Sequence, residues 1–186
     1  MIKKKKKIAI KDVKLRTFIT EDTTRNDLVH HVYDVTYGLL NNHKDTLVVL
    51  DDSIVRGTTL KESILTMLDR LQPKKIIVVS SAPQIRYPDC YGIDMSKMGS
   101  FVAFQAAVRL WKIKDEKFLP DLFRRCKEEL QKPPLEMQNL VKEVYAPFTD
   151  EEISKEIANI AKPNHIFSDV EVIYQTIDNL HQACPN

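Results

Sequence analysis

The sequence predicts an α/β fold built around a parallel sheet. Residues 47–50 and 76–79 are apolar runs rich in β-branched side chains and too short for helices, so each is expected to form a buried strand. Between them, residues 59–71 carry apolar side chains at the spacing of one helix face. Strand, helix and strand in this order form a βαβ unit, which places the two strands parallel in one sheet.

The second half of the chain is expected to be mainly helical, over residues 100–161. One apolar face is predicted from Phe118, Leu119, Leu122, Phe123, Cys126 and Leu130. Thr149 and Glu152 have the spacing of a capping box. Residues 169–174 alternate like a strand, and Thr176 is expected to cap a short last helix. Before the βαβ unit, we expect a strand at residues 16–19 and a polar segment at 20–44.

Composition indicates one globular domain and argues against several classes of partner. The 186 residues are 43% hydrophobic and 29% charged, as in a soluble domain with a core. A net charge of +2 favours neither nucleic acid nor an anionic membrane. No apolar run reaches the ~20 residues of a membrane span, and no apolar segment follows the five lysines at 3–7, so these lysines are expected in a solvated tail. Cys90, Cys126 and Cys184 form neither a disulfide framework nor a zinc pattern, which favours reduced thiols and a cytoplasmic location.

The loop that follows the first strand carries the most chemical information. It consists of Asp51, Asp52, Ser53, Ile54, Val55, Arg56, Gly57, Thr58 and Thr59. Carboxylates at a strand end accept hydrogen bonds from a ribose diol and suit Mg²⁺, while hydroxyls and N–H groups at a helix start bind phosphate. The loop is not a P-loop, because the string G-x-x-x-x-G-K-[ST] is absent. Taken singly, the two Asp residues would fit a solvated turn, and the two Thr residues would fit a helix cap.

These nine residues resemble the phosphoribosyl-pyrophosphate (PRPP) loop of phosphoribosyltransferases. Within that superfamily they are similar to the loop of amidophosphoribosyltransferases, also called glutamine phosphoribosylpyrophosphate amidotransferases. A second segment, residues 81–95, agrees through Ala82-Pro83 and Tyr91-Gly-Ile-Asp-Met95, and Arg16-Thr-Phe-Ile19 is a weaker match. The resemblance covers residues 15–98 and returns near 169–184.

The resemblance implies the carboxy-terminal part of a phosphoribosyltransferase domain. Its expected fold is a partial phosphoribosyltransferase-type parallel sheet with flanking helices and a helical insertion. Residues 1–14 would be a basic tail and lead-in, and residues 15–99 the core, with a mobile loop at 20–44 and the PRPP loop at 51–59. Residues 100–186 would form a mainly helical region with a late strand and helix.

The resemblance also implies a reaction, in which ammonia displaces pyrophosphate from PRPP to give 5-phosphoribosylamine, the first step of purine synthesis. Asp51 and Asp52 would hold the ribose diol and Mg²⁺. The 5′-phosphate would be bound by the rest of the loop, from Ser53 to Thr59, with Arg56 as the least certain contact. The second motif would lie near the site through Pro83, Tyr91, Gly92 and Asp94. No nucleophilic side chain is required, and none is assigned.

Some features of the family are missing from this sequence. Met1 is followed by Ile2 and lysines rather than by a catalytic Cys, so ammonia would come from a glutaminase domain not in this chain, which is expected to turn over little alone. Residues 31–38 replace the relatives' basic cluster. The clustered cysteines of iron–sulfur relatives are absent, so we predict no cluster. Purine nucleotides are implied as inhibitors, and the full-length protein as a homo-oligomer.

Three other functions remain open at this stage. The loop could belong to a non-catalytic module that binds PRPP or a nucleotide. It could belong to a phosphoribosyltransferase that uses a nucleobase, although residues 91–95 argue against this. The neighbouring His30 and His31 could bind a metal, although adjacent histidines in a polar segment are more often solvated.

Overall fold

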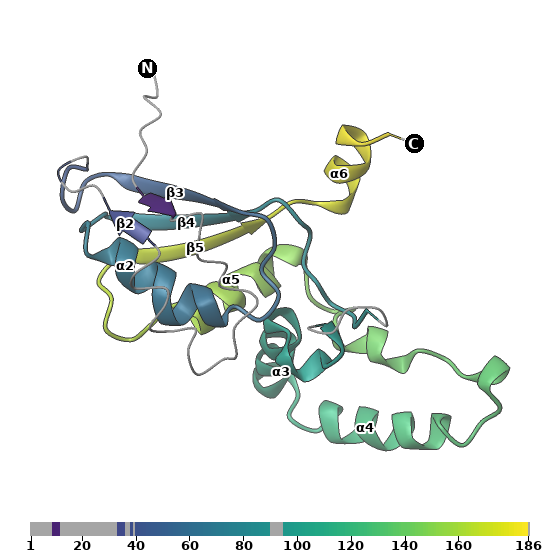
Figure 1. The fold of residues 1–186 in the computed structure, drawn as a ribbon. Coiled ribbons are helices and arrows are strands. Elements are labelled where there is room, and N and C mark those ends of the chain that lie inside the picture. The colour runs from purple at the N-terminus through teal and green to yellow at the C-terminus, as the bar shows by residue number, and fades with distance from the viewer. Residues whose placement is uncertain (1–8, 12–32, 36–37, 39, 90–94, 186) are drawn as a thin grey trace.

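The computed structural model describes residues 9–11, 33–35, 38, 40–89 and 95–185 of the chain. Its centre is a three-stranded parallel sheet in the order β3–β4–β5, formed by Thr46–Asp51, Lys75–Ser80 and Asp169–Tyr174 (Figure 1). A separate antiparallel pair joins β1, Ala9–Lys11, to β2, Tyr33–Val35.

The helices follow the order in which the sequence places them. After β3 the chain enters a π-helical segment, Leu60–Ile64, which continues into α2, Leu65–Asp69. After β4 come the short 3₁₀ turn Met98–Ser100, α3 (Val102–Lys114), α4 (Phe118–Glu129), two further 3₁₀ turns (Pro134–Glu136 and Leu140–Val144) and α5 (Asp150–Ala161). The last helix, α6, spans Ile177–Ala183 beyond β5.

The two faces of the sheet differ in burial. Leu47, Ile76 and Val172 are buried on the face that packs against α2 and α5. On the opposite face Val48 is 56% exposed and Leu50 is 79% exposed. Because side chains alternate along a strand, the core of the described residues lies on one side of the sheet.

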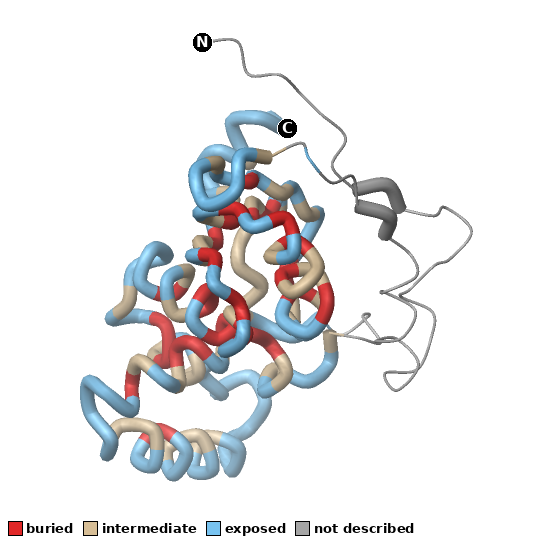
Figure 2. Tube along the Cα trace, turned by 90° about the vertical axis from the view of Figure 1, so that its left-hand side faces the viewer, coloured by how far each residue is buried: buried red, intermediate tan, exposed pale blue. Residues whose placement is uncertain are grey.

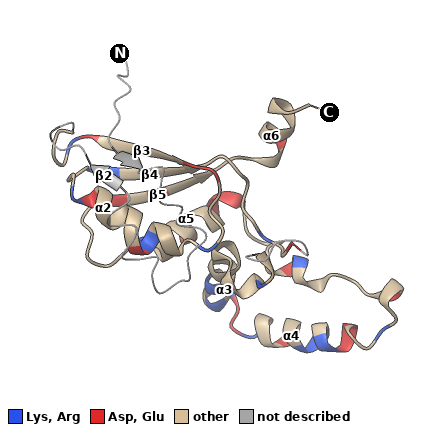
Figure 3. Cartoon of the chain, in the orientation of Figure 1, with Lys and Arg blue, Asp and Glu red and all other residues tan. Residues whose placement is uncertain are grey.

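A helical arm extends away from the sheet. The arm comprises α4 and the turns up to Val144, and it projects at the lower right of Figure 1. Its chain is mostly exposed, whereas buried residues gather between the sheet, α3 and α5 (Figure 2). The indole N–H of Trp111 donates to the Val144 carbonyl at 2.9 Å, and its ring stacks on Phe118 at 3.5 Å between centroids. Charged side chains of both signs lie along α4 (Figure 3), in the order Asp121, Arg124, Arg125, Lys127, Glu128 and Glu129.

Most predicted elements are confirmed. The strands predicted at 47–50, 76–79 and 169–174 are present and parallel. The helix between the first two strands and the helical segment from residue 100 are also present. Thr149 and Glu152 make both bonds of a capping box, and Thr176 accepts from the Asn179 N–H at 3.1 Å. The strand expected at 16–19 lies outside the described residues. Among the helices of the described residues, none is long and apolar enough to cross a membrane.

The prediction for the face of α4 was partly wrong. Leu122 is buried, but Phe123 is 62% exposed and Leu130 is 67% exposed. The arm packs against the rest of the molecule along one narrow face only, so the outer part of its apolar stripe has nothing to cover it among the described residues. The structure also adds β1 and β2, which the sequence did not indicate.

Candidate functional site

The two carboxylates lie where β3 ends and the loop begins. Asp51 is half-buried as the last residue of β3, and Asp52 is exposed immediately after it. The Asp52 N–H donates to Oδ1 of Asp51 at 3.1 Å, and the Ser53 N–H donates to Oδ1 of Asp52 at 2.8 Å. These local bonds hold both carboxylates over the start of the loop, at the carboxyl edge of the sheet where ligands of α/β proteins bind.

The middle of the loop is anchored to the core. The Ile54 side chain is buried, and the Val55 carbonyl accepts from the Val102 N–H at the start of α3, at 2.8 Å. A ligand in the loop would therefore meet the backbone of Ile54 rather than its side chain. Arg56 is half-buried beside them.

Gly57 gives the loop its turn into the helix. Its φ of +72° lies in the left-handed region, and a Cβ on it would come within 3.3 Å of a Val102 methyl carbon. The Lys61 N–H donates to the Gly57 carbonyl at 2.9 Å, so the N–H groups of Thr58 and Thr59 precede this first helical bond. Within the described part of the chain, the Thr59 side chain makes no capping bond. This favours a helix start with N–H and hydroxyl groups available to an anion over a helix start capped by its own threonine.

The second motif lies directly beside the loop. The Ser81 N–H donates to the Asp51 carbonyl at 2.9 Å, and the Ala82 N–H donates to the Asp52 carbonyl at 3.0 Å. The Ser81 hydroxyl also donates to the Asp52 carbonyl, at 3.1 Å. The structure therefore brings the two motifs together, with Pro83 half-buried after them. Tyr91, Gly92 and Asp94 lie outside the described residues.

Tyr174 is a neighbour of the loop that sequence reasoning missed. Asp51, Ser80 and Tyr174 stand in register across the three strands, so their side chains share one face. The Tyr174 hydroxyl is buried and has no hydrogen-bond partner among the residues that the structure describes. Burial first, and then the negative charge of Asp51, raise the pKa of this tyrosine. The strand pattern at 169–174 was visible in the sequence, but its place beside β4 was not.

The helical region supports the second motif from behind. The Gln84 amide donates to the Asp150 carbonyl at 2.8 Å and to the Ser154 hydroxyl at 2.9 Å. Arg86 pairs with the Asp150 carboxylate, and the Tyr145 hydroxyl donates to the Arg86 carbonyl at 2.8 Å. The start of α5, together with Tyr145 shortly before it, therefore fixes the path of the segment that leaves β4.

The donor set at the loop suits a metal that shares its ligands with a substrate. Across the residues with described positions, no group of three or more His, Cys, Asp or Glu side chains gathers as a metal centre. Mg²⁺ is commonly held by one or two carboxylates, with phosphate oxygens and waters completing its octahedron. Asp51 and Asp52 fit that role, and they do not form an all-protein site.

Part of the chain is similar in sequence to curated amidophosphoribosyltransferases. It is 48% identical over 67 residues to an amidophosphoribosyltransferase of Pasteurella multocida and 52% identical over 62 residues to one of Haemophilus influenzae. Over 58 residues it is 43% identical to the Saccharomyces cerevisiae protein of the same name. The chain resembles amidophosphoribosyltransferases. This confirms the resemblance carried by the two motifs.

The matched part is short compared with this chain and with each similar protein. It covers 36% of this chain and 13% of the Pasteurella amidophosphoribosyltransferase, 33% and 12% for Haemophilus, and 31% and 11% for yeast. The chain thus spans about an eighth of the length of the curated amidophosphoribosyltransferases it matches. No family model matches the chain. The α/β architecture with its three parallel strands is consistent with a partial phosphoribosyltransferase-type fold.

Proposed function

We propose that the loop from Asp51 to Thr59 binds PRPP together with Mg²⁺, for transfer of ammonia to the ribose. The arrangement of two carboxylates at the end of β3, followed by a helix start shaped by Gly57, supports this most directly. The carboxylates match a sugar diol and a metal, and the helix start matches a phosphate. The name of the similar proteins points to the same substrate class.

The roles divide along the loop. Asp51 and Asp52 accept hydrogen bonds from the ribose hydroxyls and hold the metal. The N–H groups and hydroxyls of Thr58 and Thr59, with Ser53, bind the 5′-phosphate. Gly57 holds the loop in the turn that presents these groups, because its left-handed φ and its missing Cβ let the loop pack closely against Val102.

In the reaction, the bond between the anomeric carbon and the pyrophosphate oxygen breaks, and pyrophosphate leaves with the electron pair. Nitrogen of ammonia forms the new bond to the same carbon and then releases a proton to solvent, giving 5-phosphoribosylamine. Bound Mg²⁺ supplies charge neutralisation for the departing pyrophosphate. The carboxylates at the ribose favour the positive charge that develops at the anomeric carbon, and fixing the ring supplies orientation.

Calorimetric titration with PRPP and Mg²⁺ tests the binding step. The double variant Asp51→Asn/Asp52→Asn removes both negative charges and is expected to weaken binding at least about tenfold, as expected for loss of charge-assisted bonds. Asp115→Asn/Glu116→Gln is the matched control, since it neutralises an adjacent exposed acidic pair after α3. Equal binding by both double variants would overturn the proposed site.

An ammonia-dependent assay of pyrophosphate release tests the transfer step. Release that depends on ammonia and disappears in Asp51→Asn/Asp52→Asn supports the transferase. PRPP binding without release under saturating ammonia would instead support a module that binds PRPP without turnover. No binding by a folded wild-type chain would contradict both functions.

A further inference from the structure

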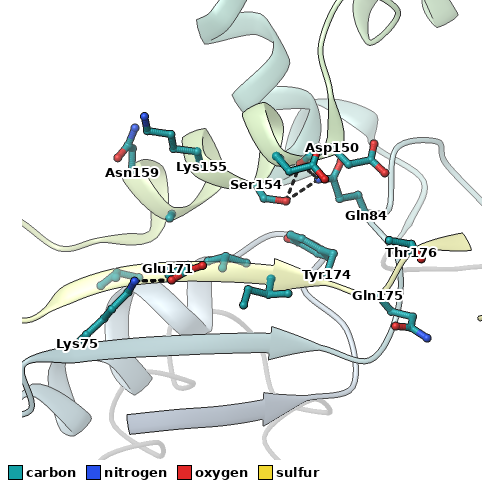
Figure 4. Close-up of a pocket in the computed structure, with 15 residues that line it drawn as sticks. Lys75, Gln84, Asp150, Ser154, Lys155, Asn159, Glu171, Tyr174, Gln175 and Thr176 are labelled. Atoms are coloured by element: carbon teal, nitrogen blue, oxygen red, sulfur yellow. Dashed lines mark hydrogen bonds and ion pairs between the residues drawn. The ribbon is translucent and has the colours of Figure 1, made fainter. Parts of the chain in front are cut away.

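A groove separates α5 from the outer strand of the sheet. Its volume is about 580 Å³, within the range of ligand-binding clefts. One wall is a single face of α5, which contributes Asp150, Glu151, Ser154, Lys155, Ala158 and Asn159. The other wall is β5 and the residues after it, and the ion pair of Lys75 with Glu171 lies near one end (Figure 4).

The groove follows the edge of β5 rather than one of its faces. Every residue from 170 to 176 lines it, without a gap. Side chains of a strand alternate between the two faces of a sheet, so a cavity against one face would meet only every second residue. Seven consecutive lining residues mean that the backbone edge of the strand forms the wall.

The hydrogen bonds to β4 show which backbone groups point into the groove. The Asp169 N–H donates to the Lys74 carbonyl at 3.2 Å, and the Gln175 N–H donates to the Ser80 carbonyl at 3.1 Å. In a parallel ladder, alternate residues face the partner strand, so the odd-numbered residues of β5 bond to β4. Val170, Val172 and Tyr174 therefore direct their N–H and C=O groups outward. In the described part of the chain, no further strand pairs with this edge.

We propose that this groove binds an extended peptide segment of a partner protein, which pairs with β5 as an added strand. Alternating outward donors and acceptors are the chemistry by which sheet edges recognise extended peptides. The groove alongside supplies room for the side chains on the α5 side. This inference is independent of the proposed transferase function.

The charges along the groove favour a partner with a basic residue at one end. Asp150, at the start of α5, lies near the carboxyl end of β5 (Figure 4). Its carboxylate is paired with Arg86, so the exposed Glu151 next to it carries the negative charge at this end of the groove. Lys155, one helical turn further along α5, places a positive charge nearer the middle of the same wall.

A second copy of this chain fits poorly, because its β5 would bring further acid in Asp169 and Glu171. Its other edge strand, β3, contains no basic residue. A different protein with a Lys or Arg next to an extended segment could both pair with the edge of β5 and place a positive charge near the acidic end of the groove.

A synthetic peptide serves as the probe, namely the fluorescein-labelled, amidated sequence Lys-Thr-Val-Thr-Val-Thr. Paired antiparallel to β5, it would place its lysine near Glu151. Fluorescence anisotropy is expected to show saturable binding to the full chain. The same peptide with alternate backbone amides N-methylated keeps its side chains but loses its donors, and its affinity is expected to fall at least about tenfold.

A pair of variants at one position separates the backbone edge from the side chain. Val172→Pro removes an outward N–H that β4 does not use, whereas Val172→Ala trims the side chain and keeps the N–H. Circular dichroism and thermal unfolding check that both variants fold. The proline variant is expected to bind the peptide at least about tenfold more weakly than the alanine variant, because only the proline variant loses a ladder bond.

A charge reversal keeps the test decisive if the proline variant does not fold. Glu151→Lys is expected to weaken the lysine peptide and to strengthen the same peptide with Glu in place of Lys, a reversal that misfolding cannot produce. Three results would overturn the proposal: no peptide binding by wild type up to about 1 mM, equal affinity of methylated and unmethylated peptides, or no exchange of preference in Glu151→Lys.

Discussion

Gly57 is the residue on which the shape of the candidate site depends most directly. Its φ of +72° is one that a side chain rarely adopts, and the nearest atom to a new Cβ belongs to Val102, a fully buried residue of α3. Neither the backbone nor the neighbour can therefore relax easily. The hydrogen bond from the Val102 N–H to the Val55 carbonyl also holds the loop against α3 at this point.

Gly57→Ala is expected to distort the loop and to weaken PRPP binding at least about tenfold, with a loss of stability of about 1–2 kcal/mol from the strained conformation. Gly99→Ala is the matched control, because a Cβ there would meet nothing within 4 Å and its φ is not in the left-handed region. Calorimetric titration and thermal unfolding measure the two effects. If Gly57→Ala binds PRPP as tightly as Gly99→Ala does, the left-handed turn is not needed for the site.

Asp69 links the end of α2 to the segment that leads into β5. Its carboxylate accepts from the Ser168 hydroxyl at 2.6 Å, from the Ser168 N–H at 2.9 Å and from the Phe167 N–H at 3.3 Å. Burial alone would raise the pKa of Asp69, but the bonds from Ser168 and Phe167, with the charge of His165, outweigh it and lower the pKa. The ionised form is thus favoured in the folded protein.

A lowered pKa makes this contribution dependent on pH. Stability from the Asp69 carboxylate is present above its ordinary pKa of 3.8 and is lost as the pH falls through the lower folded value. Asp69→Asn is expected to cost about 1–3 kcal/mol near pH 7. The difference from wild type should shrink below about pH 4. Denaturant unfolding across this pH range, with Asp115→Asn as the exposed control, measures it. The test pH of 3 is about one unit below the ordinary pKa of the carboxyl group. If the stability difference between wild type and Asp69→Asn stays constant down to this pH, the lowered pKa of Asp69 is contradicted.

Among the elements, the helical segment supports the site rather than merely extending the chain. The α3 helix packs against α5 and holds the loop through Val102, and the start of α5 holds Gln84 and Arg86 of the second motif. By contrast, the α4 arm makes few contacts with the parts that carry the site. Removing the packing of the arm should therefore leave the loop intact.

Leu122→Ala tests this separation, because Leu122 is the buried residue of α4. Its loss is expected to destabilise the arm by about 2–4 kcal/mol, within the range for buried leucines, and to speed amide exchange along α4 while PRPP binding is unchanged. Leu135→Ala is the control, since Leu135 is completely exposed and the same truncation there should change nothing. Hydrogen exchange read by mass spectrometry gives the protection of each segment. Weaker PRPP binding in Leu122→Ala would show that the arm is coupled to the site.

The elements could be predicted largely because their patterns are local. Short β-branched runs, a helical period from Leu60 and the capping box at Thr149 each depend on neighbours within a few residues. The outward turn of Phe123 could not be predicted, since a stripe of apolar residues does not say how much of the stripe finds a partner. The position of Tyr174 on the same face as Asp51, with Ser80 between them, required the order of the strands, which depends on contacts between distant segments. Gly57 is part of the loop predicted from the sequence, but its contact with Val102 was not visible there.

On the scale of the whole molecule, the asymmetry of the sheet stands out. Parallel sheets are normally covered on both faces, and the described core covers one. On the other face Val48 and Leu50 of β3 lie beside Ile77 and Val79 of β4, with 42% of Ile173 exposed at the far strand. This contiguous apolar surface is expected to make the chain associate with itself.

Val48→Thr/Leu50→Thr tests this expectation, because threonine keeps a high strand propensity while it replaces apolar surface with a hydroxyl. The double variant should reduce self-association in sedimentation velocity, and its stability should stay within about 0.5 kcal/mol of wild type, since exposed side chains leave no cavity. Val78→Thr is the control on the opposite face. Val78 is 1% exposed, so burying a hydroxyl there should cost about 1–3 kcal/mol. If the double variant loses as much stability as Val78→Thr, the face of Val48 and Leu50 is packed in the folded protein, and the one-sided core described for this sheet would be incorrect.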